Sequence, residues 1–242
     1  MGAVNDESSG IAPDRYCRDI EAYLCRKNDG HLIRIVGPAF EQVCGWATRG
    51  VPLTVACRGI DRYFERYYAK GRRRRPVRIE FCEADVLDVF DEWRRAVGIT
   101  AVNTGEGAES GESARRVGSL PAHLERVVAR LTALRAGEDR SLDVVADALI
   151  RELDTVRAGA RQLRGESREN LLDRLRQMDR ELLDAARTEM SEGALQDLAG
   201  EAARELEPFR ERLARDAYDR SIRASIDRLI RERRRLPVIT YE

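Results

Sequence analysis

Aromatic residues, histidine, lysine and long apolar runs are all scarce in this chain of 242 residues. Phe, Trp and Tyr together make up 6% of it, there are two histidines, and the only lysines are Lys27 and Lys70. No apolar run reaches the roughly 18 residues of a membrane-spanning helix, so no membrane span is expected. Residues 1–10 are polar and acidic, unlike a secretory signal, which predicts a cytoplasmic protein.

The sequence also lacks a recognisable catalytic or metal-binding pattern. Its five cysteines contain no Cys-x-x-Cys pair, and their odd number argues against a disulfide framework. Most of them stand among apolar neighbours, which predicts buried thiols. His31 and His123 have no Ser, Cys or Asp arrangement typical of a triad, and no glycine-rich phosphate loop is present. We therefore expect no enzyme activity, no cofactor and no metal site. An enzyme would need His31 to meet a cysteine or an acid in the fold.

Charge is abundant but balanced, with 43 basic and 43 acidic residues. Residues 1–97 carry 17 basic and 15 acidic residues, so neither half is strongly cationic. Binding to nucleic acid would therefore require a local basic patch rather than net charge. The predominance of arginine over lysine, with abundant alanine, is typical of a GC-rich bacterial genome, and arginine content alone does not indicate phosphate binding.

The first part of the chain is predicted to be a small helical module, residues 14–97. Residues 1–13 lack apolar periodicity and are predicted to be disordered. Apolar residues at helical spacing, with Gly or Pro at the ends, predict helices over about 14–27, 38–49, 52–69 and 83–97. Looser alternation of apolar and polar residues predicts one or two short strands, at 31–36 and 77–81.

A Gly-rich, small-residue segment, residues 98–118, is predicted to be a flexible linker to a second domain. Residues 119–235 keep an apolar spacing of about 3.5 residues in four segments separated by Gly-marked turns, which predicts an antiparallel helical bundle or coiled coil able to self-associate. Pro208 is expected to kink the last helix or to start a new one. Residues 236–242 are predicted to be extended, as a loose end, a docking peptide or an edge strand.

The most specific local feature is a basic cluster without any acidic residue. It runs from residue 66 to residue 78 and contains Arg66, Lys70, Arg72, Arg73, Arg74, Arg75 and Arg78. Guanidinium groups donate paired hydrogen bonds to phosphates, and the adjacent Tyr67 and Tyr68 are suited to stacking on unpaired bases. The alternative is internal: these cations complement the C-terminus of a helix and pair with acids of the following one, Glu83, Asp85 and Asp88.

The order of residues from 40 to 98 resembles a known family. An aromatic residue, a Trp-bearing helix, a Pro-started helix, an Arg-rich loop and a helix closing on a second Trp follow one another at Phe40, Trp46, Gly50, Pro52, Ile60, Phe64, Trp93 and Gly98. This pattern resembles the DnaD-type C-terminal domain of replication-initiation and primosome proteins, over about 60 residues. The family has a Tyr, part of its DNA-binding motif, eight residues before the second Trp. Here that position is Asp85, whereas the aliphatic position four before the Trp is kept as Val89.

These observations predict a mainly α protein that is not an enzyme. The function expected first is that of a nucleic-acid-associated or replication-accessory protein, which binds DNA or RNA through the basic cluster. The alternative is a helical scaffold or adaptor that acts only through protein partners or self-association of the C-terminal bundle. Neither function involves a membrane.

Overall fold

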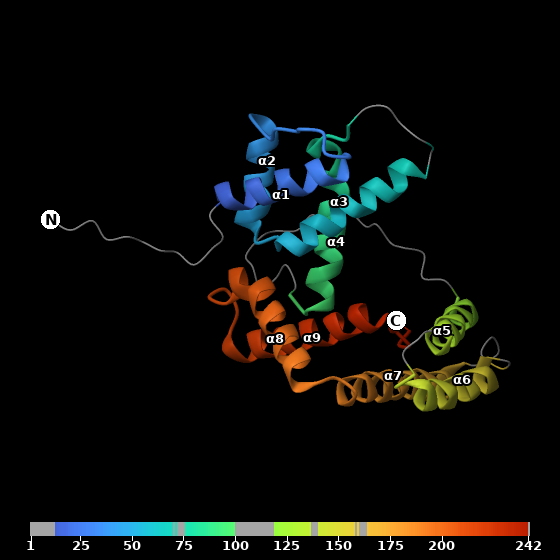
Figure 1. Ribbon diagram of the computed structural model, residues 1–242. Coiled ribbons are helices and arrows are strands. Elements are labelled where there is room, and N and C mark those ends of the chain that lie inside the picture. Colours follow the sequence, from blue (N-terminus) through green and yellow to red (C-terminus); the bar gives the residue numbers. More distant parts are fainter. Residues whose placement is uncertain are drawn as a thin grey trace. The chain divides into compact units, whose positions relative to one another are not determined.

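The computed structural model describes residues 13–69, 71, 76–99, 119–136, 140–157, 159 and 164–241. Over these ranges the chain forms nine α-helices and two short 3₁₀ turns, η1 and η3, and no strand (Figure 1). The predicted mainly α fold class is confirmed. The predicted disordered start, apart from residue 13, and residues 100–118 of the predicted linker lie outside the described residues. No helix in the described ranges is long and apolar enough to span a membrane.

The chain divides into two compact units. The first consists of residues 1–107 and 201–225, and the second of residues 108–200 and 226–242. The sequence had placed residues 201–225 in the C-terminal bundle, whereas in the structure they pack within the first unit.

Four helices and a 3₁₀ turn form the N-terminal part of the first unit. They are α1 (Pro13–Lys27), α2 (Pro38–Arg49), α3 (Leu53–Tyr68), η1 (Ile79–Cys82) and α4 (Glu83–Ala96). Their bounds follow the predicted helices closely. Helix α1 packs on α2 and α3, and α3 packs along α4 (Figure 1).

Helix α2 ends where its glycine predicts. Gly50 has a φ of 81°, in the left-handed region, and its N–H donates to the carbonyl of Ala47 at 2.9 Å. The N–H of Val51 donates to the carbonyl of Trp46 at 3.0 Å. These two bonds form a Schellman motif, for which glycine is the usual residue because it has no Cβ to oppose a positive φ.

Neither predicted short strand forms. Residues 31–36 have no regular secondary structure, and residues 79–82 wind into η1. The apolar–polar alternation of residues 77–81 ends at this turn. In a 3₁₀ helix residues three apart share a face, so Ile79 and Cys82 are both buried.

Residues 201–225 complete the core of the first unit. Phe209 is buried, and its ring centroid lies 5.8 Å from that of Trp93. The buried carboxylate of Glu205 accepts hydrogen bonds from the hydroxyl of Thr54 at 2.8 Å, the indole of Trp93 at 3.1 Å and the hydroxyl of Ser225 at 3.3 Å. A buried charge needs such donors, and these link two distant parts of the chain.

The C-terminal helical segment breaks at its proline. Helix α8 (Glu192–Leu206) is followed by η3 (Glu207–Phe209), and α9 (Arg215–Arg234) begins afresh. Pro208 lacks an N–H and its ring clashes with the preceding turn, so α8 cannot continue through it. Of the two predicted outcomes, a kink or a new start, the structure has the new start.

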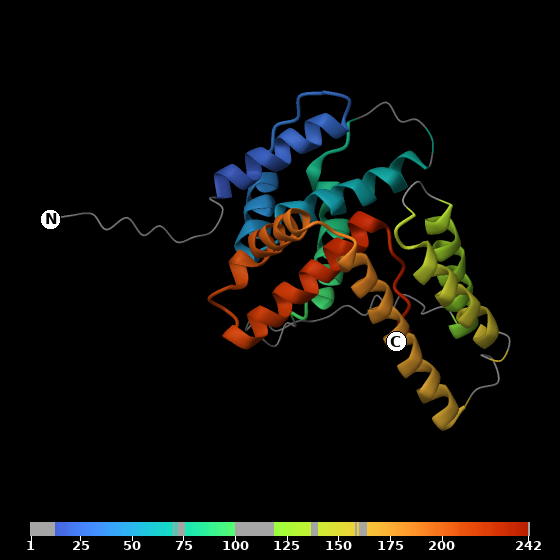
Figure 2. The same cartoon turned by 60° about the horizontal axis from the view of Figure 1, so that its bottom comes forward.

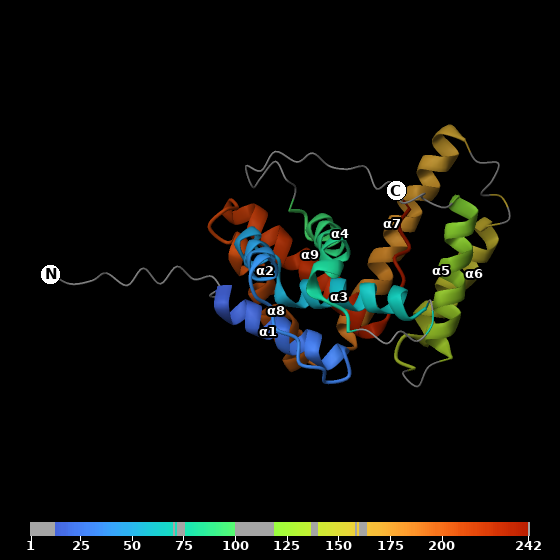
Figure 3. The same cartoon turned by 90° about the horizontal axis from the view of Figure 1, so that it is seen from above.

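The second unit contains the helices α5 (Leu120–Arg135), α6 (Asp143–Arg157) and α7 (Gly165–Thr188). Helices α5 and α6 lie side by side, and α6 also packs on α7 (Figure 3). Arg135, at the end of α5, pairs at 2.7 Å with Asp147, near the start of α6, so the two helices are antiparallel. Glu152 of α6 accepts two hydrogen bonds from Arg174 of α7, at 2.5 and 2.6 Å.

The C-terminal tail docks within the second unit, against α7 (Figure 2). Ile239 is buried, and its N–H donates to the carboxylate of Asp179 at 2.8 Å while its carbonyl accepts from His123 at 3.0 Å. Arg231 bonds both Asp179, at 2.5 Å, and the carbonyl of Pro237, at 3.0 Å. Of the three predicted roles for this segment, the structure has the docking peptide, and its partner is the chain itself.

Candidate functional site

The predicted phosphate-binding cluster starts in the last turn of α3 and ends just before η1. Arg66, Tyr67 and Tyr68 are the final residues of α3, and Arg78 precedes η1. The structure therefore describes the two ends of the cluster. The remaining members lie outside the described residues: Lys70, Arg72, Arg73, Arg74 and Arg75.

Asp85 of α4 is the buried anion at this site. Its side chain is 3% exposed, and its Oδ2 accepts a hydrogen bond from Nη2 of Arg66 at 2.6 Å. Nε of Arg62 lies 3.9 Å from Oδ1. A carboxylate that is removed from water needs such partners to offset the loss of its hydration. Arg66 therefore joins α3 to α4.

Two further carboxylates of α4 pair with arginines, one on α3 and one on α4. Glu92 accepts from Arg62 at 3.1 Å, and Asp91 pairs with Arg94 at 2.5 Å. Glu83 lies on the side of α4 that faces α2. Several of the acids that follow the basic cluster are therefore engaged within the α3–α4 pair.

The two tyrosines at the end of α3 differ in their packing. Tyr67 stacks on Tyr63, with ring centroids 5.7 Å apart and an interplanar angle of 23°. Tyr68 is 42% exposed, and its ring lies 5.7 Å from that of the buried Phe64. Tyr68 thus rests against the core and still presents surface to solvent.

Phe81 is an exposed aromatic residue that sequence reasoning missed. In the strand predicted for residues 77–81 it would share a face with Val77 and Ile79, which are both buried. Because the chain winds into η1 at this point, Phe81 turns outward and is 59% exposed. The signal that could have found it is the spacing of Ile79 and Cys82, three residues apart, which is typical of a 3₁₀ turn.

Asn28 fixes the backbone that enters η1, which sequence reasoning also missed. Its Oδ1 accepts from the N–H of Val77 at 2.6 Å, and its Nδ2 donates to the carbonyl of Val77 at 3.1 Å. The side-chain amide therefore makes the pair of bonds that a neighbouring strand would make. The sequence had indicated only a turn at this residue.

The cysteines and histidines do not form a reactive or metal-binding arrangement among the described residues. Among the described residues no group of three or more His, Cys, Asp or Glu side chains could hold a metal ion. Burial raises the pKa of Cys17 and of Cys57 to about 11, and that of Cys82 to about 12. These thiols are therefore protonated at neutral pH, whereas nucleophilic chemistry needs the thiolate. His31 and His123 each bond a backbone carbonyl.

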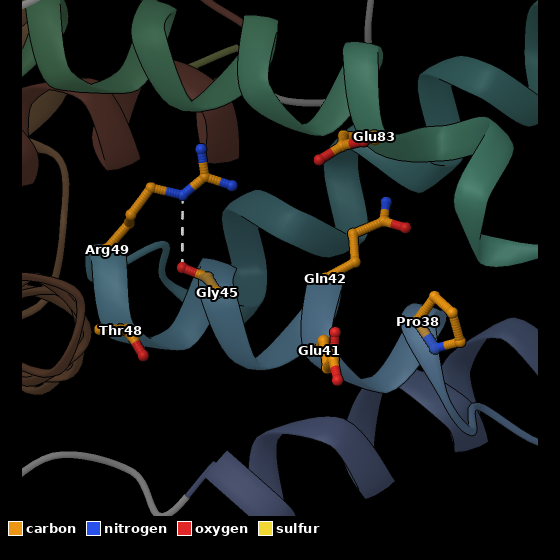
Figure 4. Close-up of a pocket in the computed structure, with 7 residues that line it drawn as sticks. All are labelled: Pro38, Glu41, Gln42, Gly45, Thr48, Arg49 and Glu83. Carbon is orange, nitrogen blue, oxygen red and sulfur yellow. Dashed lines mark hydrogen bonds between the residues drawn. The ribbon is translucent and has the colours of Figure 1, made fainter.

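An open depression of about 590 Å³ runs along α2, and it is lined mainly by polar side chains (Figure 4). The amide of Gln42 and the guanidinium of Arg49 both lie toward the space between α2 and α4, and Nε of Arg49 donates to the carbonyl of Gly45 at 3.3 Å. Nε2 of Gln42 is buried without a hydrogen-bond partner in the described part of the chain. The lining mixes acids with one cation and stays open to solvent, so it does not enclose a small molecule.

Comparison with known proteins found no matching protein family, no matching curated protein and no matching solved structure.

Proposed function

We propose that this chain is a non-enzymatic, nucleic-acid-associated protein of the replication-accessory kind, which binds backbone phosphates through residues 66–78. The observation that supports the proposal is the pairing of the α4 carboxylates. Asp85, Asp91 and Glu92 pair with arginines of α3 and α4. The negative charge of these carboxylates is therefore balanced by arginines within the helix pair, while residues 70–75 carry five cations and no acid.

The two ends of the segment have different roles in this proposal. Arg66 is a positioning residue, because its bond to the buried Asp85 anchors the end of α3. Arg78 is 72% exposed, and its contact with Glu80 is long, at 3.6 Å. Exposed ion pairs contribute little free energy, so Arg78 can exchange this contact for a phosphate at small cost.

The resemblance of residues 40–98 to the DnaD-type C-terminal domain fits the same proposal. The residue at which the sequence departs from that family, Asp85, is buried against Arg62 and Arg66 in this chain. Phosphate binding here is therefore assigned to the arginines before α4 and not to α4 itself.

Fluorescence anisotropy with a labelled oligonucleotide, from about 50 to 200 mM salt, tests the proposal. Replacing Arg72, Arg73, Arg74 and Arg75 by Ala is expected to weaken binding strongly. Loss of four phosphate contacts lowers the magnitude of the slope of log K against log salt by about 3.

A matched control removes the same charge elsewhere. Four exposed arginines of the second unit are replaced by Ala: Arg126, Arg130, Arg151 and Arg180. This variant is expected to bind like the unmodified protein. Equal losses in the two variants would reduce the effect to net charge, and unchanged binding of the first variant would overturn the proposal.

The alternative, a helical scaffold or adaptor, is favoured by one observation in the second unit. The apolar spacing of a bundle persists through α5–α7, and Val144 on α6 is 83% exposed. Contact with a second helix would take this apolar side chain out of water. Light scattering of the full chain over a range of concentrations tests self-association. Association that Val144→Asp abolishes would support it, and a monomer at every concentration would count against it.

A further inference from the structure

We propose that residues 31–36 form a docking edge for an extended peptide of another protein, which carries an acidic side chain between two apolar ones. The peptide adds to the free side of this segment as a neighbouring strand would. The sequence predicted a strand at these residues, and the described part of the chain provides no strand to pair with it. The inference is independent of phosphate binding through residues 66–78, because its observations come from the segment between α1 and α2.

One side of the segment is bonded to α1. The N–H of Ile33 donates to Sγ of Cys25 at 3.3 Å. The N–H of Ile35 donates to the carboxylate of Glu21 at 2.8 Å. The two acceptors stand four residues apart on the helix, about 6 Å along its axis, and two residues of a strand span about 6.6 Å. The spacing of the two bonds therefore matches that of a strand that runs antiparallel to α1.

The side chains of the segment alternate with the same period. Ile35 is buried and Ile33 is half-buried. Leu32 is 81% exposed, Val36 is 68% exposed, and Arg34 between them is exposed as well. In an extended chain the N–H and C=O groups of alternate residues point to opposite sides. Since the N–H groups of residues 33 and 35 face α1, those of residues 32, 34 and 36 face away from it.

The outer side of the segment has no hydrogen-bond partner. Leu32, Arg34 and Val36 form no hydrogen bond or ion pair with any other residue that the structure describes. Figure 2 shows the segment, in blue, along the outer side of α1. A row of free N–H and C=O groups is a template for a further strand, and proteins that bind peptides by strand addition use such an edge.

The exposed side chains specify the chemistry of the peptide. Residues directly opposite each other on neighbouring strands have their side chains on the same face. A carboxylate opposite Arg34 forms an ion pair, and apolar side chains two residues before and after it lie against Leu32 and Val36. The peptide therefore has the pattern apolar–x–acidic–x–apolar.

A second copy of the segment fits this edge less well. Antiparallel pairing that sets Leu32 of one copy against Val36 of the other also sets the two copies of Arg34 directly opposite each other, and like charges in that position are destabilising. A shift of the register by two residues separates the arginines but places each one opposite an apolar side chain. The edge therefore favours an acidic partner over a copy of itself.

Nuclear magnetic resonance of the full, isotope-labelled chain tests the inference with a synthetic peptide, Thr-Val-Thr-Glu-Thr-Val-Thr with blocked ends. This sequence reads the same in both directions, so it suits a parallel or an antiparallel neighbour. In the free protein the amides bonded to α1, Ile33 and Ile35, are expected to exchange slowly with solvent. The outer amides, Leu32, Arg34 and Val36, are expected to exchange rapidly. The peptide is expected to bind saturably and to slow exchange at the outer amides.

Reversal of charge makes the test specific. Arg34→Glu is expected to weaken peptide binding by about 2- to 30-fold, because it replaces an attraction between cross-strand charges by a repulsion of similar size. A peptide with Arg in place of its Glu is expected to bind this variant more tightly than the unmodified protein. The matched control is Arg130→Glu, at an exposed arginine on α5 of the second unit, and it is expected to bind the original peptide without change.

The outcomes that would overturn the inference are specific. They are equal losses in Arg34→Glu and Arg130→Glu, unchanged exchange at the outer amides, and the absence of saturable binding up to about 1 mM peptide. Slow exchange at the outer amides that depends on protein concentration, without peptide, would assign the edge to a second copy instead. Because Arg34 is exposed, its substitution keeps the fold, which a thermal melt by circular dichroism verifies.

Discussion

Substituting alanine at two helical glycines should have opposite effects on stability. Gly59 lies in α3 at its closest approach to α4, and a Cβ added there would stand 2.4 Å from Cα of Val86. The same atom would stand 2.8 Å from the backbone nitrogen and from Cγ2 of Val86. Gly45 lies in α2, and a Cβ added there would meet no atom within 4 Å.

The magnitudes follow from these distances. Alanine in place of glycine stabilises a helix interior by about 1 kcal/mol at both positions. At Gly59 the helices must separate by about 1 Å to restore a normal carbon–carbon contact. Overpacking of this kind costs about 1–3 kcal/mol or more, and two of the three contacts are with backbone that cannot change rotamer. We therefore expect Gly59→Ala to destabilise the first unit by about 2 kcal/mol and Gly45→Ala to stabilise it by up to about 1 kcal/mol.

Urea unfolding followed by tryptophan fluorescence measures this difference selectively, because both tryptophans, Trp46 and Trp93, are buried in the first unit. In thermal melts the midpoint should fall by roughly 4–8 °C for Gly59→Ala and rise by about 2–4 °C for Gly45→Ala. Adding Val86→Ala to the first variant should not rescue it, because the closest contact is with the backbone. A Gly59→Ala variant as stable as Gly45→Ala would refute the reasoning.

Three further predictions concern single side chains. Arg235 takes a φ of 54° at the end of α9, where its N–H and that of the next residue close a Schellman motif. Glycine has no Cβ to oppose a positive φ, so Arg235→Gly should raise the stability of the second unit by about 1 kcal/mol. A denaturant melt followed by circular dichroism measures this change. Asp85→Asn should cost about 1–3 kcal/mol, because it weakens a buried, charge-assisted bond, whereas Asp91→Asn, at an exposed pair, should cost less than about 0.5 kcal/mol; equal losses would contradict this. The hydrogen bond from Arg174 holds the pKa of Glu152 below its usual value of 4.5, so the pair stabilises the fold above that pH and the contribution is lost as pH falls through the lowered pKa. Stability measured from pH 7 to pH 3 should therefore fall less in Glu152→Gln than in the unmodified protein.

The sequence by itself determined the helices of this protein. Apolar residues three and four apart, with Gly50 and Pro38 at the ends of α2, define that helix within the sequence, because capping and periodicity are local properties. The break at Pro208 is equally local, since a proline beyond the first turn of a helix lacks the N–H that the helix would bond and its ring clashes with the preceding turn.

Only the tertiary structure decided which residues meet. The sequence offered a pairing of Asp85 with the basic cluster only as one of two alternatives. The packing of α4 on α3 decided that Asp85 turns inward to Arg66, because a helix face becomes buried only through what packs on it. The same reason hides Glu205, whose partners include Thr54 and Trp93, more than a hundred residues away in the chain.

The candidate site depended on both sources. Its cations are a feature of the sequence, and so is the tyrosine that ends α3. A strand over residues 77–81, as predicted, would place Phe81 on the same face as Val77 and Ile79, but the strand does not form and Phe81 is exposed. In the folded chain no strand pairs with these residues. The side-chain amide of Asn28 bonds the N–H and the carbonyl of Val77 alone, and the backbone that follows winds into η1. Local sequence thus specified the helices and the basic segment, whereas a contact between residues 49 positions apart fixed the backbone that leads into η1.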